Sequence, residues 1–277
     1  PARGGVTIYK RDAETGSSVP MGGTDWDGVA FEIVNRSAGD VTYGGVKVAP
    51  GEVVAVIRPD AQSGAATTGN GALQYGTYGI REAATSDGYL MSDTAERAFQ
   101  IRSDGEMVVL DGDEAVRNQV KRGDFEFVKV AEATSQRMAG VPFLVTSDAT
   151  GEAHVVVTDA NGQVKTSSDW NAHSSRTNAS DAAVDANGDG VFDEAEKAAV
   201  DEAKLDCYAG TWFGLHPETG DAVAPDDGLG ALPWGTYTVE ELRCAANKHY
   251  ELVKTQVAVS RHGVTVDMGT IIDDKTV

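Results

Sequence analysis

Three polar residues end apolar strand patterns in the first half of the chain: Lys10, Glu82 and Asn118. Side chains alternate between the two faces of a strand, so Lys10 shares the inward face of Val6 and Ile8. Burial among hydrophobic side chains lowers the pKa of a lysine and makes it a nucleophile. Held against an asparagine carbonyl it can attack that carbon, while a protonated glutamate passes a proton to the leaving group. These residue types predict a covalent Lys10–Asn118 amide (isopeptide) bond that forms with loss of ammonia.

The same set recurs in the second half as Lys129, Glu241 and Asp273. Lys129 continues the inward face of Phe127, and an aspartate partner would release water instead of ammonia. Asp274 stands beside Asp273, so the sequence leaves open which carboxyl group faces the lysine. An alternative interpretation places all six residues at the solvated rim, as ordinary strand ends. The repetition of the set favours the cross-link.

The elements that position these residues are strands, and their order occurs twice. Tyr78 and Ile80 share a strand face with Glu82, as Tyr237 and Val239 do with Glu241. Glycine is abundant, at 32 residues, and helical periodicity is rare. The sequence therefore predicts an all-β protein of two tandem Ig-like, prealbumin-like β-sandwiches. The first is expected at residues 1–120 and the second at 121–277, enlarged by an insertion at about 167–227.

Glycine-containing turns within these halves suggest local hairpins. Residues 98–101 and 107–110 are predicted to pair around Ser103-Asp104-Gly105, and 46–48 with 53–57 around Pro50-Gly51. A second copy of the 98–110 hairpin is expected around Arg261-His262-Gly263.

The insertion carries the spacing of an EF-hand calcium loop over residues 185–196. Gly190 stands at the sharp turn, and a helix over 194–205 is predicted to follow, so we expect a lone, dockerin-like structural Ca²⁺ site. The alternative is an acidic, solvated turn without metal. The expected ligands are the side chains of Asp185, Asn187, Asp189, Asp193 and Glu196, with the carbonyl of Val191.

Two cysteines, Cys207 and Cys244, both lie in the enlarged half, and we expect a disulfide between them, which would suit an extracellular protein. A rival interpretation is a thioester between Cys207 and Gln256. The tripeptide Arg122-Gly123-Asp124 suggests integrin binding, but at the joint between the two halves it is better explained as a turn.

The composition excludes several classes of function. With 277 residues and a net charge of −20, the chain is too acidic for nucleic acid or anionic membrane partners. No apolar run is long enough to span a membrane, and no hydrolase, metalloprotease or phosphate-loop motif occurs, so no enzyme is expected. The chain is expected to be a piece of a longer protein.

The sequence resembles the Cna B-type (SpaA-like, prealbumin-like) domains of Gram-positive surface adhesins and pilins. The resemblance rests on first strands ending Ile8-Tyr9-Lys10 and Phe127-Val128-Lys129, on Gly-x-Tyr-x-x-x-Glu at residues 76–82 and 235–241, and on Asn118 and Asp273. The tail that often follows the glutamate is altered at 84–89 and 245–250.

The resemblance implies two isopeptide bonds, with Glu82 and Glu241 as proton shuttles. It implies a structural stalk segment of a cell-surface adhesin or pilus-like protein, located in the cell wall outside a Gram-positive bacterium and flanked by further domains. The alternative function is binding of a host protein or glycan through the enlarged second half. An exposed aromatic groove on the insertion would favour that alternative, whereas inward-packed aromatics would favour the stalk.

Overall fold

The computed structural model describes residues 1–275, and the chain divides into two compact units, Pro1–Val120 and Lys121–Val277. Among the described residues almost all regular structure is β-strand, and each helix is a single short turn. This confirms the expected all-β class.

The first unit contains two main sheets. In one sheet β1 pairs in parallel with β10 and β11 and antiparallel with β6 and β7; the other has the order β5-β2-β8-β9. Strands β3 and β4 form a separate ribbon. The elements are β1 (Arg3–Asp12), β2 (Ala30–Asn35), β3 (Val41–Tyr43), β4 (Val46–Val48), β5 (Val53–Ile57), β6 (Ala65–Thr67), β7 (Leu73–Gln74), β8 (Gly76–Ala84), β9 (Arg97–Ile101), β10 (Met107–Leu110), the 3-10 helix η1 (Gly112–Glu114) and β11 (Val116–Asn118).

The second unit has the same plan. One sheet has the order β15-β12-β16 with β19 also on β12, and the other has the order β14-β13-β17-β18. Phe127 of the first sheet packs edge-on against Phe143 of the second, with ring centroids 4.8 Å apart. The strands are β12 (Arg122–Ala131), β13 (Pro142–Ser147), β14 (Ala153–Val157), β15 (Gln163–Lys165), β16 (Leu232–Pro233), β17 (Gly235–Glu241), β18 (Lys254–Val259) and β19 (Thr265–Asp273).

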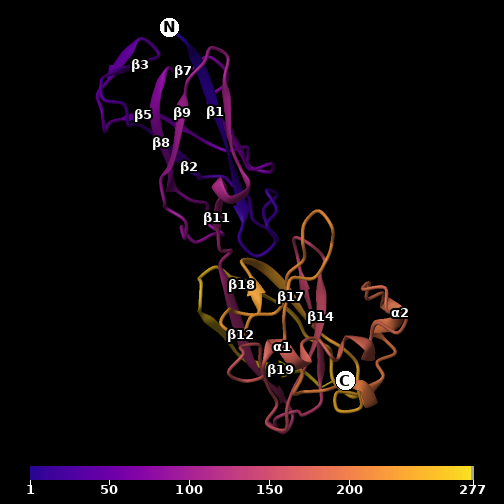
Figure 1. The fold of residues 1–277 in the computed structure, drawn as a ribbon. Helices are drawn as coiled ribbons and strands as arrows, with labels where there is room; N and C mark the ends of the chain where they lie inside the picture. The colour runs from indigo at the N-terminus through magenta and orange to yellow at the C-terminus, as the bar shows by residue number, and fades with distance from the viewer. Residues whose placement is uncertain (276–277) are drawn as a thin grey trace. The chain divides into compact units, whose positions relative to one another are not determined.

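In both units the last strand lies parallel to the first (Figure 1). Strand β1 places Lys10 opposite Val116, two residues before Asn118. Strand β12 places Lys129 opposite Ile271, two residues before Asp273. Because side chains two residues apart share a strand face, each lysine and its expected partner point into the same core.

The predicted hairpins do not form. Strand β9 pairs with β8 whereas β10 pairs with β1, so the turn between them joins the two sheets. The hairpin expected around Arg261-His262-Gly263 is absent for the same reason, because β18 pairs with β17 while β19 pairs with β12. Strand β4 pairs with β3, and β5 pairs with β2, so the Pro50-Gly51 turn is also not a hairpin turn. Core packing across the sheets decides these pairings over the local turn signals.

The insertion between β15 and β16 folds on the outer face of β13 and β14. Leu144, Val155 and Val157 face it and form a small cluster with Val184 and Leu242. Its regular elements are α1 (His173–Arg176), the 3-10 helix η2 (Asp181–Ala183), α2 (Glu194–Lys197) and the 3-10 helix η3 (Glu202–Lys204).

The helix expected over 194–205 is much shorter in the structure, because α2 ends at Lys197. The Asp201 amide bonds the Ala183 carbonyl oxygen at 2.8 Å, and Val200 and Leu205 pack on the insertion cluster. These contacts turn the chain away from the helix axis despite its alanine-rich sequence.

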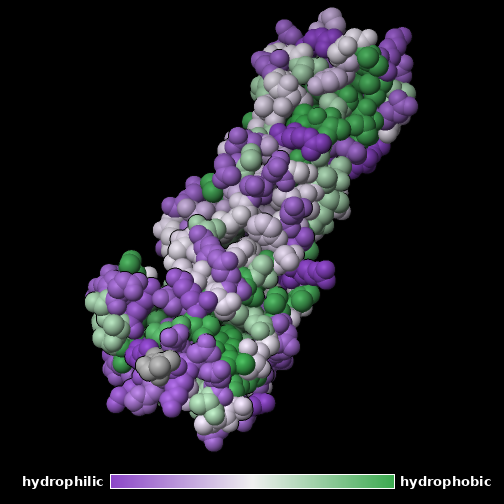
Figure 2. All heavy atoms as spheres, turned by 180° about the vertical axis from the view of Figure 1, so that it is seen from behind, coloured by the Kyte–Doolittle hydropathy of each residue, from purple (hydrophilic) through white to green (hydrophobic). Residues whose placement is uncertain are grey.

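Some of the exposed large hydrophobic side chains belong to the outward faces of strands, and others lie in loops. In β5, Val56 is 52% exposed while Val54 and Ile57 are buried, and Val46 and Val109 are exposed in the same way. Figure 2 shows hydrophobic areas among the hydrophilic side chains that cover most of the visible face.

Candidate functional site

In the first unit Lys10, Glu82 and Asn118 meet in the core. All three are at most 2% exposed, and the Lys10 Nζ lies 3.0 Å from Glu82 Oε2. The Asn118 amide nitrogen donates to Glu82 Oε1 at 2.6 Å and to Thr85 Oγ1 at 3.1 Å. The Asn118 carbonyl oxygen has no hydrogen-bond partner among the described residues. The Asn118 side-chain nitrogen is therefore held by Glu82, while its carbonyl oxygen accepts no hydrogen bond from the described residues.

Burial sets the charges of this site. It lowers the pKa of Lys10 to about 8 against the opposing charge of Glu82, and it raises the pKa of Glu82. The two shifts favour a neutral amine beside a neutral acid, the protonation state that nucleophilic attack requires. Trp26 covers the amine, with its ring centroid 5.3 Å from Nζ.

In the second unit the structure brings together Lys129, Glu241 and Asp273, each at most 1% exposed. The Lys129 Nζ contacts Asp273 Oδ1 and lies 3.8 Å from Glu241 Oε2. Burial, and then the neighbouring Asp273 carboxyl group, raise the pKa of Glu241 to about 7. Asp274 is exposed, so Asp273 is the carboxyl group that faces the lysine.

This burial rules out the alternative that the six residues are a solvated rim. The sequence pattern did not indicate the residues that surround these six. Thr85 contacts the Asn118 amide, and in the second unit Asn247, fully buried, donates to Glu241 Oε1 at 2.9 Å. Both follow the glutamate closely in the chain, and that proximity was the available signal.

Three acidic residues of the insertion form a cluster that could hold a metal ion: Asp185, Asp189 and Glu196, with carboxylate oxygens within 4.8 Å of one another. Asp185 Oδ1 is buried and has no hydrogen-bond partner among the described residues. A buried, unpartnered carboxylate oxygen beside two further carboxylates is unfavourable without a cation. The residues present therefore fit a hard divalent metal ion.

Hydrogen bonds shape the rest of this loop. Asn187 Oδ1 accepts from the Asp189 amide at 3.2 Å, and Asp185 Oδ2 accepts from the Gly190 amide at 2.8 Å. Asp193 caps α2 in a reciprocal capping box with Glu196. Val191 is exposed by 63% of its surface.

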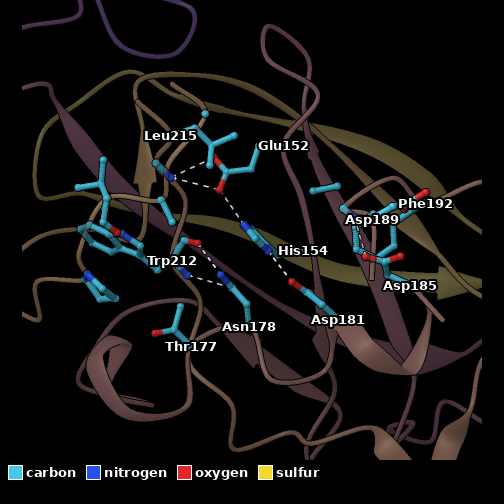
Figure 3. A pocket seen from close by; sticks show the side chains of 17 residues that line it. Glu152, His154, Thr177, Asn178, Asp181, Asp185, Asp189, Phe192, Trp212 and Leu215 are labelled. Carbon is cyan, nitrogen blue, oxygen red and sulfur yellow. Dashed lines mark hydrogen bonds and ion pairs between the residues drawn. The ribbon is translucent and has the colours of Figure 1, made fainter. Parts of the chain in front are cut away.

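A pocket of about 560 Å³ lies between this loop and the outer face of β14. Figure 3 shows His154 between Glu152 and Asp181, with Asp185, Asp189 and Phe192 beyond Asp181. Both His154 ring nitrogens lie 2.7 Å from a carboxylate oxygen.

The carboxylates set the charge of that histidine. Burial alone would lower the pKa of His154, but Asp181 and Glu152 outweigh burial and raise it to about 9. The imidazolium links β14 to η2, which leads directly into the loop that carries Asp185 and Asp189.

Two aromatic residues of the insertion pack inward, whereas Trp170 is 40% exposed and does not belong to its core. Trp212 and Phe213 are 4% and 1% exposed. Arg122 is fully buried, its guanidinium lies 3.8 Å from the Trp212 ring centroid, and it donates to the Phe213 carbonyl oxygen at 2.8 Å. The Arg122-Gly123-Asp124 tripeptide is thus a clamp on the insertion and is inaccessible to a receptor in this fold.

The expected Cys207–Cys244 disulfide is wrong, because both cysteines are free in the structure. Cys207 packs on the insertion cluster while Cys244 belongs to the main core of the second unit. Burial raises the pKa of both thiols. The thioester alternative finds no support either, since Gln256 is exposed on β18 and donates to Asp148.

No family model and no curated protein matches this chain. Among solved structures, the fold is similar to that of the Bacillus anthracis TIE protein, with a TM-score of 0.53 and 18% identity over 99% of this chain. The chain spans 35% of that protein's length.

Two pilus proteins are also similar, with lower scores. The streptococcal ancillary pilin is 18% identical over 99% of this chain and 63% of its own, with a TM-score of 0.31. The pilus adhesin SpaC from Lactobacillus rhamnosus GG is 15% identical over 94% of this chain and 26% of its own, with a TM-score of 0.39. The similarity to the TIE protein is one of fold alone. None of the helices described is both long and apolar enough to cross a lipid bilayer.

Proposed function

We propose that this chain is a stalk segment of a Gram-positive cell-surface adhesin or pilus-like protein, built from two tandem Cna B-type domains that isopeptide bonds lock. The observation that carries the proposal is the buried lysine, glutamate and Asn/Asp set, which recurs at the same strand register in both units. Buried free ions are poor core residues, so a selected chemical role accounts for their repetition better than stability does.

The reaction follows from the contacts. The neutral Lys10 Nζ attacks the Asn118 side-chain carbonyl carbon and loses one proton to Glu82, the C–N bond to Nδ2 breaks, and Glu82 passes a proton to the departing nitrogen, which leaves as ammonia. In the second unit Lys129 attacks the Asp273 carboxyl carbon with Glu241 as the acid, and water leaves. One amide bond forms in each unit, and neither step requires an external enzyme.

Such bonds would suit a protein that bears load. Tension would pass along residues 1–10, cross to Asn118, continue to Lys129 and cross to Asp273. The segments between each lysine and its partner would carry no force, and the sheets there would not unravel under load. Reduction would not open the links, in contrast to disulfides.

Single-molecule force spectroscopy tests this role. The wild-type chain should release no length from either cross-linked segment before it detaches. In Glu82→Gln, which lacks the acid, the first unit should unfold and release about 110 residues, roughly 370 Å at ~3.4 Å per residue. Release of that length by the wild-type chain would refute the stalk mechanism.

We also propose that the insertion binds Ca²⁺ through Asp185, Asn187, Asp189, Asp193, Glu196 and the Val191 carbonyl. The unpartnered Asp185 oxygen and the three clustered carboxylates support the site. The ion would supply a positive charge that holds η2 and α2 together. Calorimetric titration of the chelator-treated chain should detect one site, and absence of heat and of any thermal shift would refute it.

A second candidate function is ligand binding by the insertion pocket, whose volume lies within the range of small-molecule sites. In this proposal a host glycan or a peptide of a host protein is the ligand. Inward packing of Trp212 and Phe213 favours the stalk. The observation that favours ligand binding is the pocket itself. Ala222 lines it and is exposed, so Ala222→Trp should abolish binding on a glycan or matrix-protein array. Equal binding by this variant would exclude the pocket.

A further inference from the structure

The two sites hold their glutamates in different ways. In the first, Glu82 Oε1 accepts from the Asn118 amide at 2.6 Å, so the substrate side chain itself orients the acid. Asp273 in the second unit has no N–H group to donate. There the Asn247 amide donates to Glu241 Oε1 at 2.9 Å, in the place that the substrate amide takes in the first unit.

Asn247 is fixed in this position by its own contacts. It is fully buried, its Nδ2 also donates to the Leu242 carbonyl oxygen at 2.9 Å, and its Oδ1 accepts from the Cys244 amide at 2.8 Å. All of these partners belong to the segment that follows Glu241. The side chain therefore arrives at the glutamate in one orientation, with a donor and not an acceptor facing it.

An inserted stretch of chain supplies Asn247. Tyr89 bridges to Val120 in the first unit, and Tyr250 bridges to Lys275 in the second, at equivalent places beyond the reacting Asn or Asp. The segment from the glutamate to this tyrosine is longer in the second unit. The added residues allow the chain to fold back and bring an amide against Glu241.

We propose that Asn247 is a positioning residue that adapts the second site to an aspartate partner. The proposal rests on the cross-linking function above. By donating to Oε1, Asn247 leaves the acidic proton of Glu241 on Oε2, the oxygen nearer to Lys129, while the Val253 amide makes a longer contact to Oε2 at 3.2 Å. Lys129 and Asp273 then condense with loss of water, and Asn247 itself forms and breaks no covalent bond.

The test measures bond formation in four chains: wild type, Asn247→Ala, Asp273→Asn and the double variant. Each is collected unlinked in denaturant, folded by dilution and weighed by mass spectrometry at intervals. Loss of one hydrogen-bond donor should slow the second bond about tenfold in Asn247→Ala. The double variant should recover, releasing ammonia, because the amide introduced by Asp273→Asn would donate to Glu241 as Asn118 does to Glu82. The Lys10–Asn118 bond is the internal control.

The outcomes separate the two proposals. A wild-type chain that never loses water would refute the cross-linking function itself. If the wild type loses water and Asn247→Ala does so at the same rate, the positioning role is wrong. If Asn247→Ala is slow and the double variant is equally slow, Asn247 is only structural, and the positioning role is again refuted.

A second variant covers the case in which Asn247→Ala does not fold. Asn247→Asp keeps the acceptor for the Cys244 amide but loses its donor when ionised. Its rate relative to wild type should rise as the pH falls toward the ordinary pKa of a carboxyl group, where the introduced side chain would regain a proton to donate. A relative rate that does not change with pH would overturn the proposal.

Discussion

The Glu82→Gln variant gives the most informative perturbation of the first unit. Glutamine keeps the size of the side chain but cannot transfer a proton, so Lys10 and Asn118 should stay unlinked. The missing bond would have closed a loop of about 110 residues, which in the chain-entropy model stabilises the fold by about 5 kcal/mol. For a unit of this size that corresponds to a fall in Tm of about 20 °C.

Scanning calorimetry measures this fall, with the transition of the second unit as a reference in the same trace. Glu32→Gln is a matched control, because Glu32 lies on neighbouring β2 and makes a partly exposed ion pair with Arg81. Such a pair contributes at most about 1 kcal/mol. The prediction is wrong if the Tm of Glu82→Gln falls no further than that of Glu32→Gln. It is also wrong if the Glu82→Gln chain is lighter than its sequence mass by one ammonia, as expected for the wild type.

Three further results are expected for the second unit. At a calcium concentration about ten times Kd, binding should stabilise the second unit by about 1.4 kcal/mol and raise its Tm. Asp185→Ala should abolish this calcium-dependent rise in Tm, and an unchanged rise would exclude the site. Because the folded pKa of His154 is about 9 against an ordinary 6.5, its charge stabilises the fold below pH 6.5, and up to about 3 kcal/mol should be lost as the pH rises from 6.5 to 9. Denaturant titrations should show that loss in wild type and not in His154→Gln. Arg122→Ala should cost about 3 kcal/mol or more, since it leaves buried carbonyl groups unpaired, and a loss below 1 kcal/mol would contradict the clamp.

The burial of the two lysines was predictable because strand periodicity is local. A lysine at an inward position after Val6 and Ile8 points into the core whichever strand lies beside it. Recurrence of the same pattern around Lys129 added an independent observation. The clustering of Asp185, Asp189 and Glu196 was likewise predictable, because these acidic residues lie within one short segment.

Features that depend on distant partners were not predictable. The sequence around Gly105 suits a hairpin, yet β10 pairs with β1 across the core. The segment after Lys197 favours a helix, but the Asp201 amide finds a better acceptor at Ala183. Counting two cysteines gave no information on their distance. Asn247 was hidden because its contact with Glu241 depends on how a loop folds back.

The intact mass of the wild-type chain, measured after denaturation and reduction, tests the central claim most directly. We expect a mass below that of the sequence by one ammonia from the first unit and one water from the second. Glu82→Gln should recover the ammonia alone, and Glu241→Gln the water alone. A wild-type mass equal to the sequence mass would show that neither bond forms and leave two sandwiches with unreacted polar residues in their cores.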